Sequence, residues 1–451
     1  MPISQHSDQT FASDPSLLRQ IAHDVLAHAR AEGASAAETE VSESFGQNVT
    51  VRRGEVETIE YNRDKGLGVT VYIGKSRGHA SSSDFSGKAI RDTVQAALSI
   101  ARLTAADEFS GLAEPELLAT EFPDLELYFP WELTVEQAIE KARACEDAAF
   151  AADPSISNSE GASVSVQQAQ FVYGNSSGFL AGYPSSRHSI SCAVIAGKDD
   201  AMQRDDWYTS ARDPADLDSE IQVGTRAGKR AARRVGARKL PTAKAPVLYE
   251  APVAGGLLGH FVAAVSGGSL YRKSSFLLDC IGKQVFAPGI RIRDLPHIRK
   301  GLASSAFDDE GVATRARDIV ERGMLQGYFL GSYSARKLGM QTTGNAGGNH
   351  NLLLDPTAGD LATLMKMMGR GFLVTDLLGQ GINMVTGDYS RGAAGFWIED
   401  GEIAFPVQEV TIAGNLRDMF RNIVAVGNDI EVRGSRRCGS VLVEGMTMAG
   451  E

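Results

Sequence analysis

His260 is the residue of this chain whose type and position come closest to catalytic chemistry. It lies in the segment 256–273, GLLGHFVAAVSGGSLYRK, which is expected to form one helix. A helix that holds catalytic zinc needs two histidines about one turn apart on one face, and a glutamate beside the first to activate the bound water. Here Phe261 takes the position of the glutamate and Val265 that of the second histidine. One neutral imidazole cannot hold catalytic zinc, so no catalytic residue and no cofactor are assigned to this chain.

Two further segments carry polar side chains of the types that bind ligands. Arg272 and Lys273 end the helix expected to begin near His260, and their donors could bind peptide carbonyls or a partner's carboxylates. A purely structural salt bridge is the alternative. The segment 343–350, TGNAGGNH, places Asn349 and His350 in a glycine-rich loop, which suits a backbone that approaches a ligand closely. These four residues are candidates for a substrate groove.

A third segment, 386–395, reads TGDYSRGAAG and places Asp388, Tyr389 and Arg391 between small residues. Their polar side chains could project into a groove while the glycines leave space beside it. The alternative is a tight β-turn with an Asp–Arg pair. His260 is counted with these groove candidates.

Cysteines offer little metal chemistry. Cys145, Cys192, Cys280 and Cys438 lie far apart with no CxxC pair, so neither a disulfide framework nor a Cys-rich zinc site is indicated. His260 and Cys438 remain weak metal candidates, to which His350 could add a ligand in an unusual geometry. Because no glutamate adjoins His260 to act as the base, an inactive chain is favoured over this hypothesis.

The elements that position these residues can be read from periodicity. Ser13 or Asp14 can cap a helix that carries Pro15 in its first turn, and helical spacing returns over 86–103. Alternating runs at 48–53 and 67–73, separated by glycines, predict antiparallel strands. Thr134 with Gln137 forms a capping box for a helix to about residue 152. A basic helix is expected over 214–239, with RNA, an acidic partner or solvent as the alternatives for its charged face.

Together these elements predict an α+β fold with antiparallel sheets in the N-terminal modules and a larger, mostly β C-terminal domain. The expected ranges are 14–105 for an N-terminal domain, 106–133 for a connection, 134–239 for a middle domain and 240–451 for the C-terminal domain. GNSSG at 174–178 fits the G-x-S-x-G pattern of a hydrolase nucleophile, but strand-like residues flank it, and a hairpin turn is the favoured interpretation.

Composition excludes several function classes. The 451 residues include 43% hydrophobic ones and carry a net charge of −11, which disfavours nucleic acid and anionic membranes as partners. Neither a signal peptide at the N-terminus nor an apolar run of about 18 or more residues is visible. A cytoplasmic location is expected.

Long blocks of the sequence resemble a known family. The blocks include GGSLYRKSSFLLDCIGKQV from 267, GLASSAFDDEG from 301, SYSARKLG from 332, TGNAGGNHN from 343, TGDYSRGAAGFWIEDGEI from 386 and AGNLRDMFRNIVAVGNDIE from 413. With RGEVETIEYNRDKGLGVTVY from 53 and GNSSGFLAGYPSSRHS from 174, they resemble the PmbA (TldE) branch of the TldD/PmbA family, the modulators of DNA gyrase, over nearly the whole chain.

The resemblance implies a cytosolic zinc metallopeptidase built as a heterodimer of this chain with a TldD-type paralogue, and links it to peptide maturation and antitoxin turnover. TldD-type chains carry an HExxxH helix, on which His260 matches the first ligand, Phe261 the catalytic glutamate and Val265 the second histidine. Cys438 lies close to a C-terminal cysteine ligand of that type. Zinc is therefore expected in the partner, and this chain is expected to be its inactive subunit, acting on peptides or unfolded proteins. A homodimer is possible when the chain is isolated.

The alternative function is of a different class. The family name also fits a binding or regulatory protein that acts on DNA gyrase or another partner without proteolysis.

Overall fold

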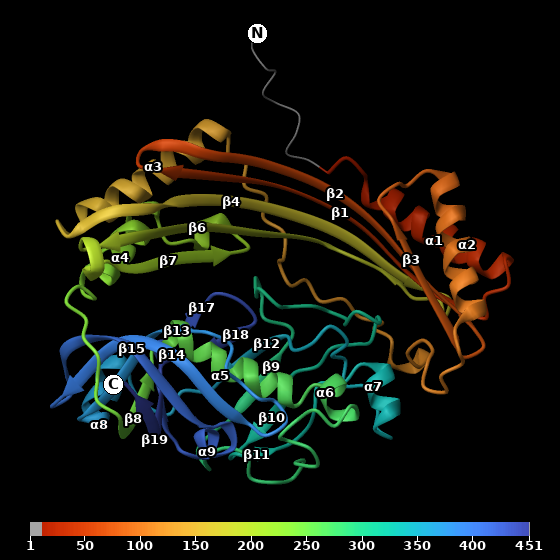
Figure 1. Ribbon diagram of the computed structural model, residues 1–451. Helices are drawn as coiled ribbons and strands as arrows, with labels where there is room; N and C mark the ends of the chain where they lie inside the picture. The colour runs from red at the N-terminus through yellow and green to blue at the C-terminus, as the bar shows by residue number, and fades with distance from the viewer. Residues whose placement is uncertain (1–10, 451) are drawn as a thin grey trace.

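The structure is a computed structural model that describes residues 11–450. Residues 1–10, on which the expected absence of a signal peptide partly rests, lie outside this range. Within it the strands form three sheets. One sheet arches over the C-terminal half of the chain, which carries the other two (Figure 1). No helix in residues 11–450 combines the length and the apolar character needed to cross a membrane.

The arched sheet is antiparallel, with strand order β3-β2-β1-β4-β6-β7, and β5 pairs with β4. Its long central strands β1 and β4 pair from Glu38↔Asn175 to Val51↔Ala162, so they join segments that are far apart in the sequence. The strands are β1 (Ala36–Arg52), β2 (Glu55–Ile73), β3 (Ser76–Ser82), β4 (Ile156–Asn175), β5 (Leu180–Ala181), β6 (Pro184–Ala196) and β7 (Gln203–Ala211). The predicted ranges 14–105 and 134–239 therefore share one sheet, and their division into two domains stays a prediction.

Helices cover the two ends of this sheet, and their caps follow the sequence signals. Asp14 caps α1 (Pro15–Ala31), Ser86 caps α2 (Gly87–Leu103), and the capping box of Thr134 and Gln137 opens α3 (Val135–Ala151). The predicted basic helix 214–239 is wrong in extent. Pro214–Asp216 form a separate 3-10 turn, and α4 (Glu220–Ala232) begins only after Ser219, whose side chain caps it.

The segment 174–178 forms the expected turn, with Gly178 at φ 97° between β4 and β5. The hydroxyl of Ser176 accepts a hydrogen bond from the Ala37 backbone N–H at 3.0 Å. It therefore has a structural role at the sheet end.

The C-terminal half contains two mixed sheets with orders β15-β14-β13-β8-β19-β16 and β11-β10-β9-β12-β18-β17, and β15 also pairs with β19. The first consists of β8 (Ala243–Tyr249), β13 (Gly371–Leu378), β14 (Asp388–Glu399), β15 (Glu402–Asn415), β16 (Ile423–Val426) and β19 (Val441–Ala449). The second consists of β9 (Ile292–Leu295), β10 (Arg317–Glu321), β11 (Met324–Leu325), β12 (Asn351–Leu354), β17 (Glu431–Val432) and β18 (Arg436–Cys438). The helices are α5 (Ala251–Ala264), α6 (Gly267–Tyr271), α7 (Ser332–Lys337), α8 (Leu361–Met368) and α9 (Leu416–Arg421). The predicted α+β class with antiparallel sheets is confirmed.

Arginines of α4 connect the two halves. Arg230 is buried and bonds Asp205 of β7 at 3.0 Å and Glu250, just before α5, at 2.8 Å. Arg233 reaches the same Glu250 at 3.3 Å. Part of the predicted basic run is therefore a buried ion network rather than a solvated helix face.

Candidate functional site

Helix α5 carries the site and lies on the side of the C-terminal half that faces the arched sheet (Figure 1). Pro252 stands in its first turn, and the Ala251 N–H donates to the Ser440 hydroxyl at 3.1 Å. Leu258 and Phe261 are buried on one side, whereas the half-buried residues of the other side include Gly259 and His260. The helix thus presents His260 on a face lined by small residues.

The single helix predicted over 256–273 is wrong. α5 ends at Ala264, and a separate helix α6 starts after Ser266, whose backbone is extended at φ −78° and ψ 138°. At Gly267 a side chain would lie 2.2 Å from Ser334 Oγ, so tertiary packing requires glycine where the helix would otherwise continue. Arg272 and Lys273 therefore do not continue the helix of His260.

Phe261 and Val265 both lie in the apolar core. Each has 0% of its surface exposed. The Phe261 ring makes edge contacts with Phe286, at 5.1 Å between centroids, and with Phe420 at 6.3 Å. The position at which the family's zinc helix has its glutamate is thus turned away from His260 and filled by packing.

His260 is surrounded by groups that disfavour positive charge. Its ring lies 5.9 Å from that of Tyr389, edge to face. Burial lowers the pKa of His260 to about 4, and the nearby guanidinium groups of Arg391 and Arg436 lower it further. His260 is therefore neutral at neutral pH.

Strand β14 brings Tyr389 and Arg391 to one face because alternate residues of a strand point to the same side. Arg391 Nη2 donates to the Leu377 carbonyl at 3.2 Å. Asp388 is exposed and bonds Asn415 Nδ2 at 3.1 Å. The alternative of a tight turn with an Asp–Arg pair is wrong, since the segment is a regular edge of β14 and Asp388 pairs elsewhere.

Arg436 of β18 completes this group, although sequence reasoning did not select it. Its guanidinium lies against Gly259, where an added Cβ would be 2.8 Å from Nη1. The signals available in the sequence were the pair Arg436–Arg437 beside Cys438 and a glycine directly before His260.

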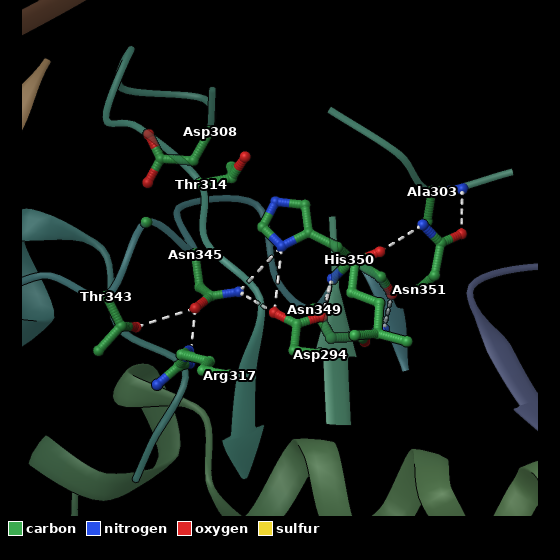
Figure 2. A network of polar contacts seen from close by, with 12 residues as sticks. Asp294, Ala303, Asp308, Thr314, Arg317, Thr343, Asn345, Asn349, His350 and Asn351 are labelled. Carbon is green, nitrogen blue, oxygen red and sulfur yellow. Dashed lines mark hydrogen bonds and ion pairs between the residues drawn. The ribbon is translucent and has the colours of Figure 1, made fainter. Parts of the chain in front are cut away.

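Asn349 and His350 belong to a second polar cluster, shown in Figure 2. His350 is buried, its backbone N–H donates to Asp294 Oδ1 at 2.9 Å, and its Nδ1 lies 3.1 Å from Asp294 Oδ2. Asn345 Nδ2 donates to the same Oδ2 at 2.9 Å, and Asn349 Nδ2 to the His350 carbonyl at 2.6 Å. These bonds hold the 343–350 loop on β9, so the glycine-rich segment is rigidly anchored.

A carboxyl group with a raised pKa lies beside that loop. Asp308 is buried, and burial together with the charge of Glu310 raises its pKa to about 7. Hydrogen bonds from the backbone N–H groups of Ala346, Glu310 and Val312 oppose this rise.

Arg272 and Lys273 are exposed after α6, away from both clusters. Arg272 Nη1 donates to the Tyr271 hydroxyl at 3.0 Å, and the Tyr271 ring packs on Tyr333 at 5.7 Å. The structure thus separates the predicted groove residues into three groups.

The side chains near His260 do not suit a zinc ion. Cys438 is 1% exposed, and burial together with Asp429 raises the pKa of its thiol to about 12, which disfavours the thiolate that zinc requires. Two guanidinium groups repel a cation at His260. Across residues 11–450 no group of three or more His, Cys, Asp or Glu side chains is arranged to hold a metal ion.

Family models cover most of the chain. The central and C-terminal domains of the PmbA/TldA metallopeptidases match residues 128–238 and 242–450, and domain 1 of the same group matches 37–101. The chain belongs to the PmbA/TldD family. The resemblance stated from the sequence blocks is thereby confirmed.

Curated relatives agree with this family. The metalloprotease PmbA of Escherichia coli O157:H7 is 51% identical over 94% of both chains, and a metalloprotease PmbA homologue of Haemophilus influenzae is 48% identical over 100% of both. A metalloprotease TldD homologue, also of Haemophilus influenzae, is 23% identical over 82% of this chain and 81% of its own length. One organism therefore carries both branches of the PmbA/TldD family.

Solved structures share the fold. A candidate modulator of DNA gyrase from Bacteroides thetaiotaomicron has a TM-score of 0.92 at 28% identity, covering 98% of this chain and 100% of its own. TldE from Thermococcus kodakarensis has a TM-score of 0.85 at 19% identity over 95% of this chain and 100% of its own, which shows likeness of fold.

Proposed function

We propose that this chain is the non-catalytic subunit of a two-chain cytosolic zinc peptidase whose TldD-type partner holds the zinc. The observation that carries the proposal is the environment of His260. Its would-be companions Phe261 and Val265 are buried in the core, and the charged groups nearest to it are guanidinium groups. Such a site stabilises negative rather than positive charge. In this role the chain shapes the chamber in which the partner acts.

Two findings support a two-chain assembly. Curated relatives of this chain are named metalloproteases, although the donors at its own zinc-helix position do not suit zinc. Haemophilus influenzae carries a TldD homologue beside a PmbA homologue. A chamber formed by the two chains would take extended peptides or unfolded proteins, held partly by main-chain hydrogen bonds at a strand edge. The isolated chain would pair with itself for want of that partner.

Metal content and peptidase activity of this chain alone, of the paralogue alone and of their mixture test the proposal. Zinc is expected in the paralogue, and cleavage of unfolded peptides is expected from the mixture. Activity of the paralogue that is unchanged by this chain would contradict the proposal. So would about one tightly held zinc ion per copy of this chain.

A second candidate is a binding protein that acts on DNA gyrase or another partner without proteolysis. The description of the Bacteroides thetaiotaomicron structure as a candidate modulator of DNA gyrase favours it. A pull-down from cell extract that recovers gyrase and no TldD-type chain would select this function over the first.

A further inference from the structure

We propose that Arg391 and Arg436, which converge on His260, form a binding site for the carboxylate of an extended peptide. The proposal deepens the proposed function, on which it rests, by naming the group of the substrate or product that this chain holds. It assigns a binding role to the position at which a catalytic relative would hold metal.

The first step is the absence of a counter-charge. Neither guanidinium has a carboxylate partner among the ion pairs of residues 11–450. Arg391 uses one nitrogen on the Leu377 carbonyl, while its Nε is buried and bonds no described residue. A buried donor left without an acceptor costs about 1–3 kcal/mol. An incoming anion would recover that cost.

The second step is that three different elements hold the group in place. Arg391 comes from β14, Arg436 from β18 and His260 from α5. Arg436 keeps its position because Gly259 leaves the helix surface bare there. Two guanidinium forks set by separate elements match the planar, bidentate geometry of a carboxylate.

The third step is access and room for a peptide backbone. Arg436 is exposed and His260 half-buried, so the group opens to solvent. On the same helix an added Cβ at Gly256 would meet nothing within 4 Å. Tyr389, 2% exposed, forms the floor, and its hydroxyl lies beside that of Tyr249, which donates to Met446 Sδ at 3.3 Å.

A carboxylate fits the charges better than a cation or a neutral group. Neutral His260 adds a hydrogen-bonding nitrogen without further charge, and the two arginines attract a negative group. Every peptide carries a carboxylate at its C-terminus, and each cleavage by a peptidase creates a new one. Acidic side chains are the other source of the same group.

Binding of short peptides to the full chain, without its partner, tests the site. Three alanine-rich peptides with a fluorophore at the N-terminus would be compared by fluorescence anisotropy: one with a free C-terminus, one amidated, and one amidated with an internal glutamate. The free acid is expected to bind at least about tenfold more tightly than the neutral amide. Tight binding of the glutamate peptide would support the site with side chains as its source.

Variants decide whether these residues are responsible. Arg436→Gln, at an exposed position, is expected to reduce affinity for the free acid to that for the amide, while Arg315→Gln at another exposed arginine of this half leaves it unchanged. Tyr389→Phe is expected to keep most of the affinity, which shows that the fold around β14 survives. Equal binding of acid and amide, an unaffected Arg436→Gln, or displacement of the peptide by inorganic phosphate at lower concentrations than by peptide would each overturn the proposal.

The outcome is separable from that of the proposed function. A chain that binds free-acid peptides but leaves the paralogue's cleavage unchanged would support the carboxylate site and contradict the two-chain peptidase. A chain that raises cleavage but does not distinguish acid from amide would do the reverse.

Discussion

Arg436 lies against the backbone of α5 at Gly259, so that a Cβ at that position would be 2.8 Å from its Nη1, 2.9 Å from its Cζ and 3.2 Å from its Nη2. A residue of β18 thereby places its charge beside His260, the next residue of the helix. The close contact links a missing side chain on one element to a cation on another. It also makes position 259 a way to disturb the carboxylate site without altering any of its functional groups.

Gly259→Ala is expected to displace the guanidinium of Arg436 and to weaken binding of free-acid peptides severalfold. Stability should not fall, since Ala is favoured over Gly in a helix by about 1 kcal/mol and an exposed arginine can move. Gly256→Ala is the matched control, because its Cβ meets nothing within 4 Å. Urea unfolding and peptide anisotropy measure both effects. Identical peptide affinities of the two variants would contradict the role of this contact.

His260 should titrate at about pH 4 in the folded protein, well below its ordinary value of 6.5. Between these values the unfolded chain binds a proton that the folded chain does not, so His260 contributes stability above pH 6.5 that is lost as the pH falls through 4. NMR of the imidazole Cε1–H measures the pKa directly. His260→Gln should reduce the loss of stability over this range, whereas a titration near pH 6.5 would show that Arg391 and Arg436 do not act on the ring.

Phe261→Glu, which restores the glutamate of the zinc helix, is expected to yield no peptidase activity. The new carboxylate would enter the core between Phe286 and Phe420 with no partner, and stability should fall by roughly 3–5 kcal/mol. Phe261→Leu, which keeps an apolar side chain there, should cost less. Denaturant unfolding and zinc-supplemented peptide assays of both variants check the expectation. A stable, active Phe261→Glu protein would show that the position faces the site.

Arg230→Met should destabilise the protein by about 3 kcal/mol, because it leaves the buried Asp205 and Glu250 without their shared cation. Lys88→Met provides the comparison at the exposed Lys88–Asp92 pair, where at most about 0.5 kcal/mol is expected. Chemical unfolding of each variant gives the two numbers. Equal effects would mean that the α4 arginines do not hold the two halves together.

Local signals in the sequence were sufficient for the start of several helices. Asp14, Ser86 and Thr134 cap helices as expected because a cap depends on residues within one turn. The break after Ala264 was not predictable in the same way, since it depends on the contact of Gly267 with Ser334, which is remote in sequence. Pairing of β1 with β4 is equally non-local.

The candidate site shows the same division. Tyr389 and Arg391 could be selected together because residues two apart share a strand face, and the identity of His260 drew attention to α5. Arg436 could not be placed, since only the tertiary fold brings β18 to α5. The burial of Phe261 and the neutral state of His260 likewise follow from packing and from charges on other elements.

Titration of this chain into a fixed amount of the zinc-loaded TldD-type paralogue is the most direct test of the central claim. The rate at which an unfolded peptide is cleaved should rise from near zero and level off at equimolar amounts of the two chains, with this chain inactive by itself. Cleavage by this chain alone, or a rate that does not depend on its addition, would contradict the account.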